Sequence, residues 1–122
     1  MSEAAFDTGI LLDLLAGVVP AQRELERFPR RYVSRLSWIE VMTRALPEDG
    51  NRAKAFLDYF SIVELSEEIA RRAAVLRSER RGLPVADAVI LASAQVHGRI
   101  LVTRNTKDFP ATLPGIRVPY TL

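Results

Sequence analysis

The chain contains no cysteine, one histidine and few aromatic residues, and each shortage excludes a class of function. Without cysteine there are no disulfides, no thiolate nucleophiles, and no zinc or iron–sulfur sites built on cysteine. The single histidine, His97, is expected near the C-terminal end of a helix, where it interacts favourably with the helix dipole. Histidine-rich metal sites and histidine-based catalysis are therefore not expected. Aromatic residues make up only 7% of the chain, so any bound nucleic acid would be held mostly through its backbone rather than by base stacking.

The sequence also lacks a long hydrophobic run and a large net charge. No stretch reaches about 18 consecutive apolar residues, and residues 1–5 have no basic segment followed by an apolar one. We therefore expect no membrane association and a cytoplasmic location. The formal net charge is only +2, yet fifteen of the seventeen basic residues are arginine, which suits bidentate contact with phosphate or carboxylate. This composition hints at an anionic partner, and a general preference for arginine explains it equally well.

What the chain does contain is an alternation of short apolar strands and helices. Its 122 residues, 48% of them hydrophobic, fit a single domain over residues 1–122 with an ample core. Strands are predicted at 4–6, 32–33, 62–65, 99–102 and 116–118, and helices at 10–17, 20–28, 38–46, 52–60, 66–81 and 84–96. Strands separated by helices predict the α/β class, with a parallel sheet covered on both faces. Ligands of such sheets gather beyond the carboxyl ends of the strands, and Asp7 and Asn105 directly follow two of these ends.

Acidic side chains lie at element boundaries within apolar surroundings in four separate patches. These patches are Phe6-Asp7-Thr8, Ser37-Trp38-Ile39-Glu40, Pro84-Val85-Ala86-Asp87 and Thr103-Arg104-Asn105-Thr106-Lys107-Asp108. If the patches converge, two unit charges about 5 Å apart at an effective dielectric constant near 20 cost about 3 kcal/mol. Divalent cations such as Mg²⁺ and Mn²⁺ prefer oxygen ligands and cancel that repulsion. The pattern therefore predicts metal-dependent hydrolysis of a phosphodiester.

The predicted helix 84–96 supports this interpretation most strongly. It is apolar nearly all round and belongs in the interior, where an unpaired Asp87 would be costly. A metal or another cation resolves the conflict. Arg104 and Lys107, beside Asn105, are candidates for contact with a substrate phosphate, and exposure without a specific role is the alternative for both.

Each acidic residue also has a purely structural explanation. Asp7 can cap the first helix, and Asp87 suits the first turn after Pro84. Ser37 and Glu40 have the spacing of a capping box, and Glu40 with Arg44 has the spacing of an ion pair along a helix. Asn105 and Asp108 are common turn residues. Only convergence in the folded chain distinguishes a site from four local features.

These patches resemble PIN-domain ribonucleases, in particular VapC-type toxins of bacterial toxin–antitoxin pairs. The resemblance runs in family order through Phe6-Asp7-Thr8 with Ile10-Leu11-Leu12, then Ser37 to Val41, Leu83 to Ala94, and Leu101 to Phe109. It implies a three-layer α/β/α sandwich with a central parallel sheet and a Mg²⁺- or Mn²⁺-dependent endoribonuclease. It also implies a homodimer and inhibition by a small VapB-type antitoxin that inserts a basic side chain into the acidic pocket.

The resemblance also carries residue roles over to this sequence. It implies that Asp7, Glu40 and Asp87 are acidic metal-site residues. The fourth catalytic position falls on Asn105, where relatives carry an acid, with Asp108 as a nearby supporting acid. This departure puts a second metal ion in question, and the RNA target stays open among transfer, ribosomal and messenger RNA.

Three other classes of protein share parts of this pattern. A catalytically silent PIN-like module that binds protein or RNA is compatible with Asn105, although Asp7, Glu40 and Asp87 argue against it. A phosphoacceptor signalling domain has a similar length and architecture, but the adjacent acidic pair expected after the first strand is missing. A phosphatase with an aspartate nucleophile would need a second aspartate where Gly9 stands. The metal-dependent ribonuclease fits the residues best.

Overall fold

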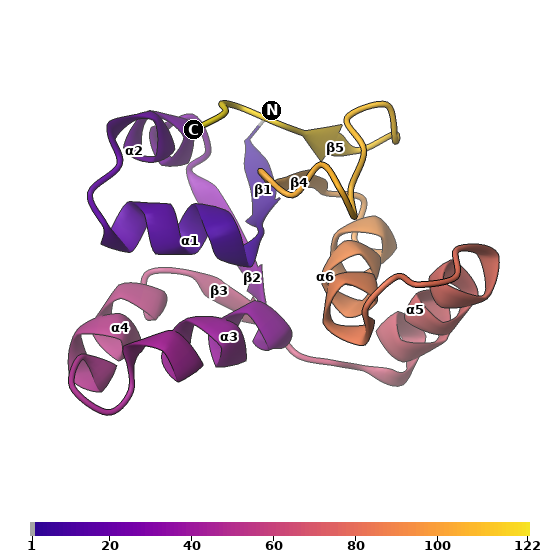
Figure 1. Ribbon diagram of the computed structural model, residues 1–122, viewed down its shortest axis with the longest axis horizontal. Coiled ribbons are helices and arrows are strands. Elements are labelled where there is room, and N and C mark those ends of the chain that lie inside the picture. Colours follow the sequence, from indigo (N-terminus) through magenta and orange to yellow (C-terminus); the bar gives the residue numbers. More distant parts are fainter. Residues whose placement is uncertain (1) are drawn as a thin grey trace.

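Five parallel strands form one sheet at the centre of the computed structural model, which describes residues 2–122 (Figure 1). The strands run in the spatial order β3-β2-β1-β4-β5. Their bounds are β1 (Glu3–Phe6), β2 (Arg30–Ser34), β3 (Ser61–Val63), β4 (Ile100–Val102) and β5 (Ile116–Arg117). From β1 the chain builds outward through β2 and β3, and then returns to pair β4 with the other edge of β1. The strand order therefore reverses between β1 and β4, which is where ligands of parallel sheets bind.

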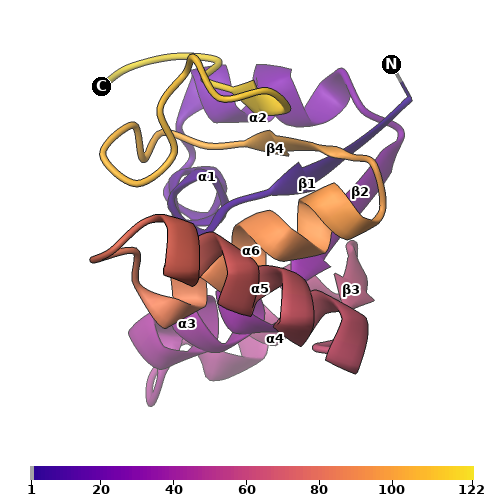
Figure 2. The same cartoon turned by 90° about the vertical axis from the view of Figure 1, so that its right-hand side faces the viewer.

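Six helices cover the two faces of this sheet. The helices are α1 (Thr8–Leu15), α2 (Val19–Glu26), α3 (Arg35–Ala45), α4 (Gly50–Leu57), α5 (Glu67–Glu79) and α6 (Val85–Val96). Figure 1 shows α1 to α4 on one side of the sheet and α5 and α6 on the other, and Figure 2 shows α5 and α6 lying in front of the strands. The predicted α/β class and the α/β/α sandwich are confirmed.

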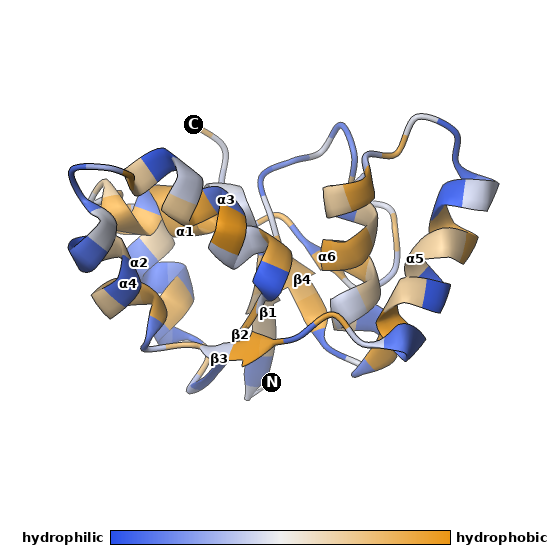
Figure 3. Cartoon of the chain, turned by 90° about the horizontal axis from the view of Figure 1, so that it is seen from below, coloured by the Kyte–Doolittle hydropathy of each residue, from blue (hydrophilic) through white to orange (hydrophobic). Residues whose placement is uncertain are grey.

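Each face of the sheet has its own apolar core. On the side of α1 to α4, Phe6 of β1 packs edge-to-face against Phe28 and Phe60, with ring centroids 6.0 and 6.1 Å apart. On the other side, α6 is buried at every position from 88 to 94, as its apolar composition predicts. Figure 3 shows hydrophobic residues in α6, which lies beside the strands. Within residues 2–122, no helix combines the length and apolar character needed to cross a membrane.

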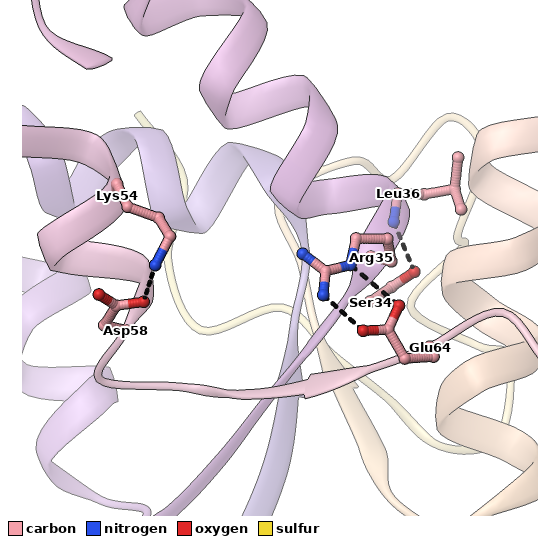
Figure 4. Close-up of polar contacts among 6 residues, drawn as sticks. All are labelled: Ser34, Arg35, Leu36, Lys54, Asp58 and Glu64. Carbon is pink, nitrogen blue, oxygen red and sulfur yellow. Dashed lines mark hydrogen bonds and ion pairs between the residues drawn. The ribbon is translucent and has the colours of Figure 1, made fainter. Parts of the chain in front are cut away.

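The start of α3 differs from the prediction, and the difference affects the site. The helix begins at Arg35, and the hydroxyl of Ser34 accepts a hydrogen bond from the backbone N–H of Leu36 at 3.1 Å (Figure 4). The predicted capping box between Ser37 and Glu40 is therefore wrong, because Ser34 already caps the helix one turn earlier. Arg35 also pairs with Glu64 after β3, which fixes the entry to the helix. Ser37 is left free for a contact inside the protein.

Other boundaries moved by a few residues. The helix predicted at 52–60 is α4, which begins at Gly50 and ends at Leu57. The strand predicted at 62–65 is shorter and ends at Val63. The side chain of Ser66 caps α5, and His97 lies at the end of α6, as the sequence indicates.

Candidate functional site

A pocket of about 290 Å³ opens at the carboxyl end of the sheet, beside the point where the strand order reverses. Four of the five predicted catalytic residues line it: Asp7, Glu40, Asp87 and Asn105. The fifth, Asp108, shares a hydrogen bond with Asp87. We call this hollow the acidic pocket. The remaining lining residues are Thr8, Gly9, Leu12, Arg44 and Arg104.

Asp7 lies at the base of the acidic pocket and is 5% exposed. It follows β1 directly, and its backbone N–H bonds to the carbonyl of Val102 in β4. One carboxylate oxygen accepts from the backbone N–H of Thr8 at 2.7 Å, which caps α1, and the other accepts from the hydroxyl of Thr103 at 2.6 Å. Burial raises the pKa of Asp7, while these two hydrogen bonds oppose the rise. Asp7 is thus both a helix cap and a fixed carboxylate in the pocket.

Glu40 reaches the acidic pocket from the middle of α3. The hydroxyl of Thr8 donates to its Oε1 at 2.6 Å, and the hydroxyls of Thr8 and Ser37 are 3.0 Å apart. Because the single hydroxyl proton of Thr8 goes to Glu40, the fully buried Ser37 donates its own proton to Thr8. Within residues 2–122, Glu40 and Arg44 form no ion pair within 4 Å, so the predicted pairing along the helix does not occur. Glu40 is held by neutral donors instead.

Asp87 and Asp108 act as one acidic pair. Asp87 lies in the first turn of α6, as expected from its position after Pro84. Burial raises the pKa of Asp87 to about 7, and the hydrogen bond and negative charge of Asp108 add to the effect. The hydrogen bond from Asn105 lowers the pKa of Asp108. Below about pH 7, the pair therefore holds a proton mainly on Asp87 rather than on Asp108.

Asn105 organises the turn that carries Asp108. Its side-chain amide donates to a carboxylate oxygen of Asp108 at 3.1 Å, and its side-chain carbonyl faces the backbone N–H of Asp108 at 3.3 Å. An aspartate at position 105 would repel Asp108, whereas the amide attracts it. Arg80, which ends α5, donates to the backbone carbonyls of Lys107 and Asp108 and holds the turn from outside. Arg80 was not predicted, and nothing in its local sequence distinguishes it from neighbouring arginines.

The two predicted phosphate contacts are placed differently. The guanidinium of Arg104 binds both carboxylate oxygens of Asp13, at 2.6 and 3.0 Å. Tyr120 also donates to Asp13, at 2.7 Å. The charge of Arg104 is therefore balanced, although its side chain borders the pocket. Lys107 is exposed, and its positive charge helps to keep Asp108 ionised.

The chemical types of the side chains in the acidic pocket suit a hard divalent cation. The pocket offers carboxylate, amide and hydroxyl oxygens, which Mg²⁺ and Mn²⁺ prefer, and no sulfur or imidazole. Within residues 2–122, however, no three acidic side chains lie close enough together to enclose one ion as they stand. Asp7, Glu40 and Asp87 are the residues that could hold it, after a carboxylate turns and Asp87 releases its proton. A bound cation would offset the burial and the mutual repulsion that raise the pKa of Asp87, so binding of the cation and release of the proton are linked.

Sequence reasoning missed the hydroxyl groups that hold these acids. Thr8 and Thr103 each donate to a pocket carboxylate, and both belong to the patches that carry the acids. The available signal is their position in the sequence, because Thr8 lies two residues after the end of β1 and Thr103 one residue after the end of β4. A buried hydroxyl next to a strand end must find a polar partner, because burying it unbonded is costly.

Comparison with known proteins identifies the class. The sequence matches the model of the family described as PIN domain over residues 4–112. The chain therefore belongs to the PIN domain family, and the resemblance to VapC-type members of that family is confirmed. A search among curated proteins found no match.

Solved structures give the same fold. A toxin–antitoxin complex from Klebsiella pneumoniae contains a chain that is 43% identical, with a TM-score of 0.90, and the match covers 98% of this chain and 99% of that one. FitAcB from Neisseria gonorrhoeae is 22% identical with a TM-score of 0.79, over 98% and 99% of the two chains. DNA-bound VapBC from Salmonella typhimurium is 21% identical with a TM-score of 0.76, over 96% of each chain. The last two similarities concern the fold alone.

Proposed function

We propose that this chain is the toxin of a toxin–antitoxin pair and cleaves RNA as a Mg²⁺- or Mn²⁺-dependent endoribonuclease. The observation that carries the proposal is the gathering of Asp7, Glu40 and Asp87 in one pocket, at the strand reversal of a PIN domain. The 43% identical chain belongs to a toxin–antitoxin complex, which supports the toxin role. Residues 1–122 act as a single PIN domain in this proposal.

The roles of the residues follow from their contacts. Asp7, Glu40 and Asp87 hold the cation through carboxylate oxygens. When bound, the cation lowers the pKa of a water molecule and stabilises the leaving oxygen of the phosphodiester. Thr8 and Thr103 fix the orientation of Glu40 and Asp7, so that little side-chain freedom is lost when RNA binds. Asn105 and Asp108 keep Asp87 in place, and Lys107 is the more available of the two predicted phosphate contacts.

The partners follow from the same charges. RNA is the substrate, and a VapB-type antitoxin inhibits by placing a basic side chain among the pocket carboxylates, where it competes with the metal. The 43% identical chain was solved in a toxin–antitoxin complex, which supports a partner of this kind. A homodimer and a cytoplasmic location complete the proposal and rest on the family resemblance.

The test compares three aspartates by the same substitution. Asp7→Asn and Asp87→Asn remove a pocket charge, whereas Asp58→Asn removes an exposed charge that pairs with Lys54 on α4. We expect RNA cleavage with Mg²⁺ or Mn²⁺ to fall by about 10²-fold or more in the first two variants and to stay unchanged in the third. In Asp7→Asn, the asparagine oxygen still accepts the hydrogen bond from the backbone N–H of Thr8, and the hydroxyl of Thr103 can reorient. The temperature of thermal unfolding should therefore change little. Full activity of purified Asp7→Asn would contradict the proposal.

The alternative function is a catalytically silent PIN-like module that binds protein or RNA. The amide at position 105 is the observation that favours it, because Asn105 is committed to holding Asp108 rather than free for a cation. Titration calorimetry with Mn²⁺ separates the two functions. Heat of binding that disappears in Asp87→Asn supports the nuclease, and no binding at millimolar metal supports the silent module.

A further inference from the structure

Two arginines border the acidic pocket, and only one of them has its charge balanced. Arg104 is bound by both oxygens of Asp13. Arg44 is exposed, and among residues 2–122 its side chain has no hydrogen bond and no carboxylate within 4 Å. The difference arises at Glu40, which turns toward Thr8 at 2.6 Å instead of pairing with Arg44. Arg44 is therefore a free cation at the rim of an acidic site.

Arg44 lines three neighbouring hollows of the protein surface. It lines the acidic pocket, a hollow of about 230 Å³ with Thr8, Glu40 and Thr43, and a groove of about 240 Å³ between α1, α3 and α4. Arg44 follows Glu40 by four residues of α3, a distance of about 6 Å along the helix axis. An anion held by Arg44 would thus lie beside the carboxylates and outside the metal-binding position.

We propose that Arg44 binds the RNA phosphate next to the one that is cleaved. This inference rests on the proposed ribonuclease function. A polyanionic strand that enters a negatively charged pocket is repelled unless a cation at the rim meets it. A guanidinium binds phosphate through two parallel hydrogen bonds and loses little freedom in doing so. Arg44 is the pocket-lining arginine whose fork is free, so it takes the role that the sequence alone assigns to Arg104.

The experiment measures RNA binding without cleavage. A short, labelled single-stranded RNA of mixed sequence is titrated with the Asp87→Asn protein at several salt concentrations, using fluorescence anisotropy. Arg44→Gln, Arg44→Lys and Arg71→Gln are then added to that background. Arg71 is the matched control, because it is an exposed arginine on α5 that pairs with the exposed Glu67.

We expect Arg44→Gln to weaken RNA binding about tenfold and to reduce the slope of log affinity against log salt by about 0.7, the value for one phosphate contact on a single strand. Arg44→Lys should keep the slope and lose part of the affinity, because lysine retains the charge but not the fork. Arg71→Gln should change neither. In the active protein, Arg44→Gln should raise KM with little change in kcat, as loss of uniform binding does.

The possible failures are distinguishable. If the protein cleaves RNA but Arg44→Gln leaves affinity, slope and KM unchanged, this inference is overturned and the ribonuclease function stands. The same conclusion follows if Arg44→Gln weakens only the binding of a VapB-type antitoxin. If the parent protein neither cleaves nor binds RNA, both the inference and the ribonuclease function fail. Circular dichroism of each variant confirms that the comparison is between folded proteins.

Discussion

Carboxylates are buried or half-buried both in the acidic pocket and beneath the C-terminal segment, residues 103–122. Arginines of the C-terminal segment bind the two carboxylates beneath it, whereas Asp7, Glu40 and Asp87 in the pocket have no arginine or lysine partner among residues 2–122. Glu24 on α2 is 3% exposed and binds Arg117 of β5 through both oxygens. Asp13 on α1 is 7% exposed and binds Arg104, with Tyr120 as a second donor. Each of these acids is neutralised by an arginine that approaches from the C-terminal third of the chain.

The acids of the pocket are held in a different way. Asp7 accepts from a backbone N–H and a threonine hydroxyl, and Glu40 accepts from a threonine hydroxyl. Among residues 2–122, no lysine, arginine or histidine nitrogen lies within 4 Å of the carboxylates of Asp7, Glu40 or Asp87. Neutral donors orient a carboxylate without cancelling its charge. The comparison teaches that Glu24 and Asp13, which serve the fold, are paired with cations of the chain, whereas Asp7, Glu40 and Asp87 have no such partner among residues 2–122.

The same substitution in the two regions should give opposite results, and the pocket should show the larger effect. Glu40→Gln removes one charge from three that repel one another, so stability should stay equal or rise slightly. RNA cleavage should fall by about 10²-fold or more if Glu40 is the metal ligand that we propose. Cleavage assays with purified protein, together with thermal unfolding, measure both. A Glu40→Gln protein that is fully active but unstable would reverse the comparison.

Glu24→Gln should have its main effect on stability. Glutamine keeps the shape of the side chain but cannot neutralise Arg117, and the charged hydrogen bonds are lost. We expect the free energy of unfolding to fall by about 1.5 kcal/mol, the lower end for charge-assisted hydrogen bonds, because Arg117 is 37% exposed. Urea denaturation measures this loss. Cleavage by the folded protein should be unchanged, since Glu24 does not line the pocket.

Thr103→Val sharpens the comparison by removing a neutral donor from the pocket. Valine has a similar shape, but Asp7 then loses the hydrogen bond at 2.6 Å that opposes the rise of its pKa. The pKa of Asp7 should rise further, and apparent affinity for Mn²⁺ near neutral pH should weaken about fivefold, equivalent to about 1 kcal/mol. Thr103→Ser restores the hydroxyl and serves as the control. Equal Mn²⁺ affinity in the valine and serine variants would show that the bond does not matter.

A further prediction concerns the pH dependence of stability and the pair of Asp87 and Asp108. In the folded, metal-free protein Asp87 has a pKa of about 7, well above its ordinary value of 3.8, so the folded state binds its proton more tightly than the unfolded chain does. This group therefore favours folding at low pH, and its contribution is lost as pH rises from about 4 to about 7. With a chelator present, Asp87→Asn should unfold at a higher temperature than the parent. The difference in unfolding temperature should grow from about pH 4 to about pH 7 and then level off. A margin independent of pH would contradict the assignment.

Much of the fold is predictable because its signals are local. Short apolar strands and the apolar helix 85–96 follow from composition, and alternation of strands with helices predicts a parallel sheet. The start of α3 was misplaced because Ser34 and Ser37 lie one turn apart and both precede an apolar run. Only the packed structure shows that Ser34 caps the helix while Ser37 faces Thr8.

The site is predictable in part for the same reason. Asp7 and Asn105 follow adjacent parallel strands, so their meeting is expected from topology. The partner of Arg104 was not predictable, because Asp13 lies 91 residues away in the sequence and Tyr120 lies beyond the last strand. Helical spacing alone favoured an ion pair between Glu40 and Arg44, and a threonine from another helix overrides it. Long-range competition for polar partners decides which charges stay free.

The most direct test of whether the pocket carboxylates bind a cation is a titration with Mn²⁺. Binding is measured as the loss of the electron paramagnetic resonance signal of free Mn²⁺. The parent protein should remove free Mn²⁺ saturably, Asp7→Asn and Glu40→Gln should do so with affinity reduced about tenfold or more, and Glu24→Gln should match the parent. Equal binding by the parent and Asp7→Asn, or none by either at millimolar metal, would show that the pocket carboxylates do not form a cation site.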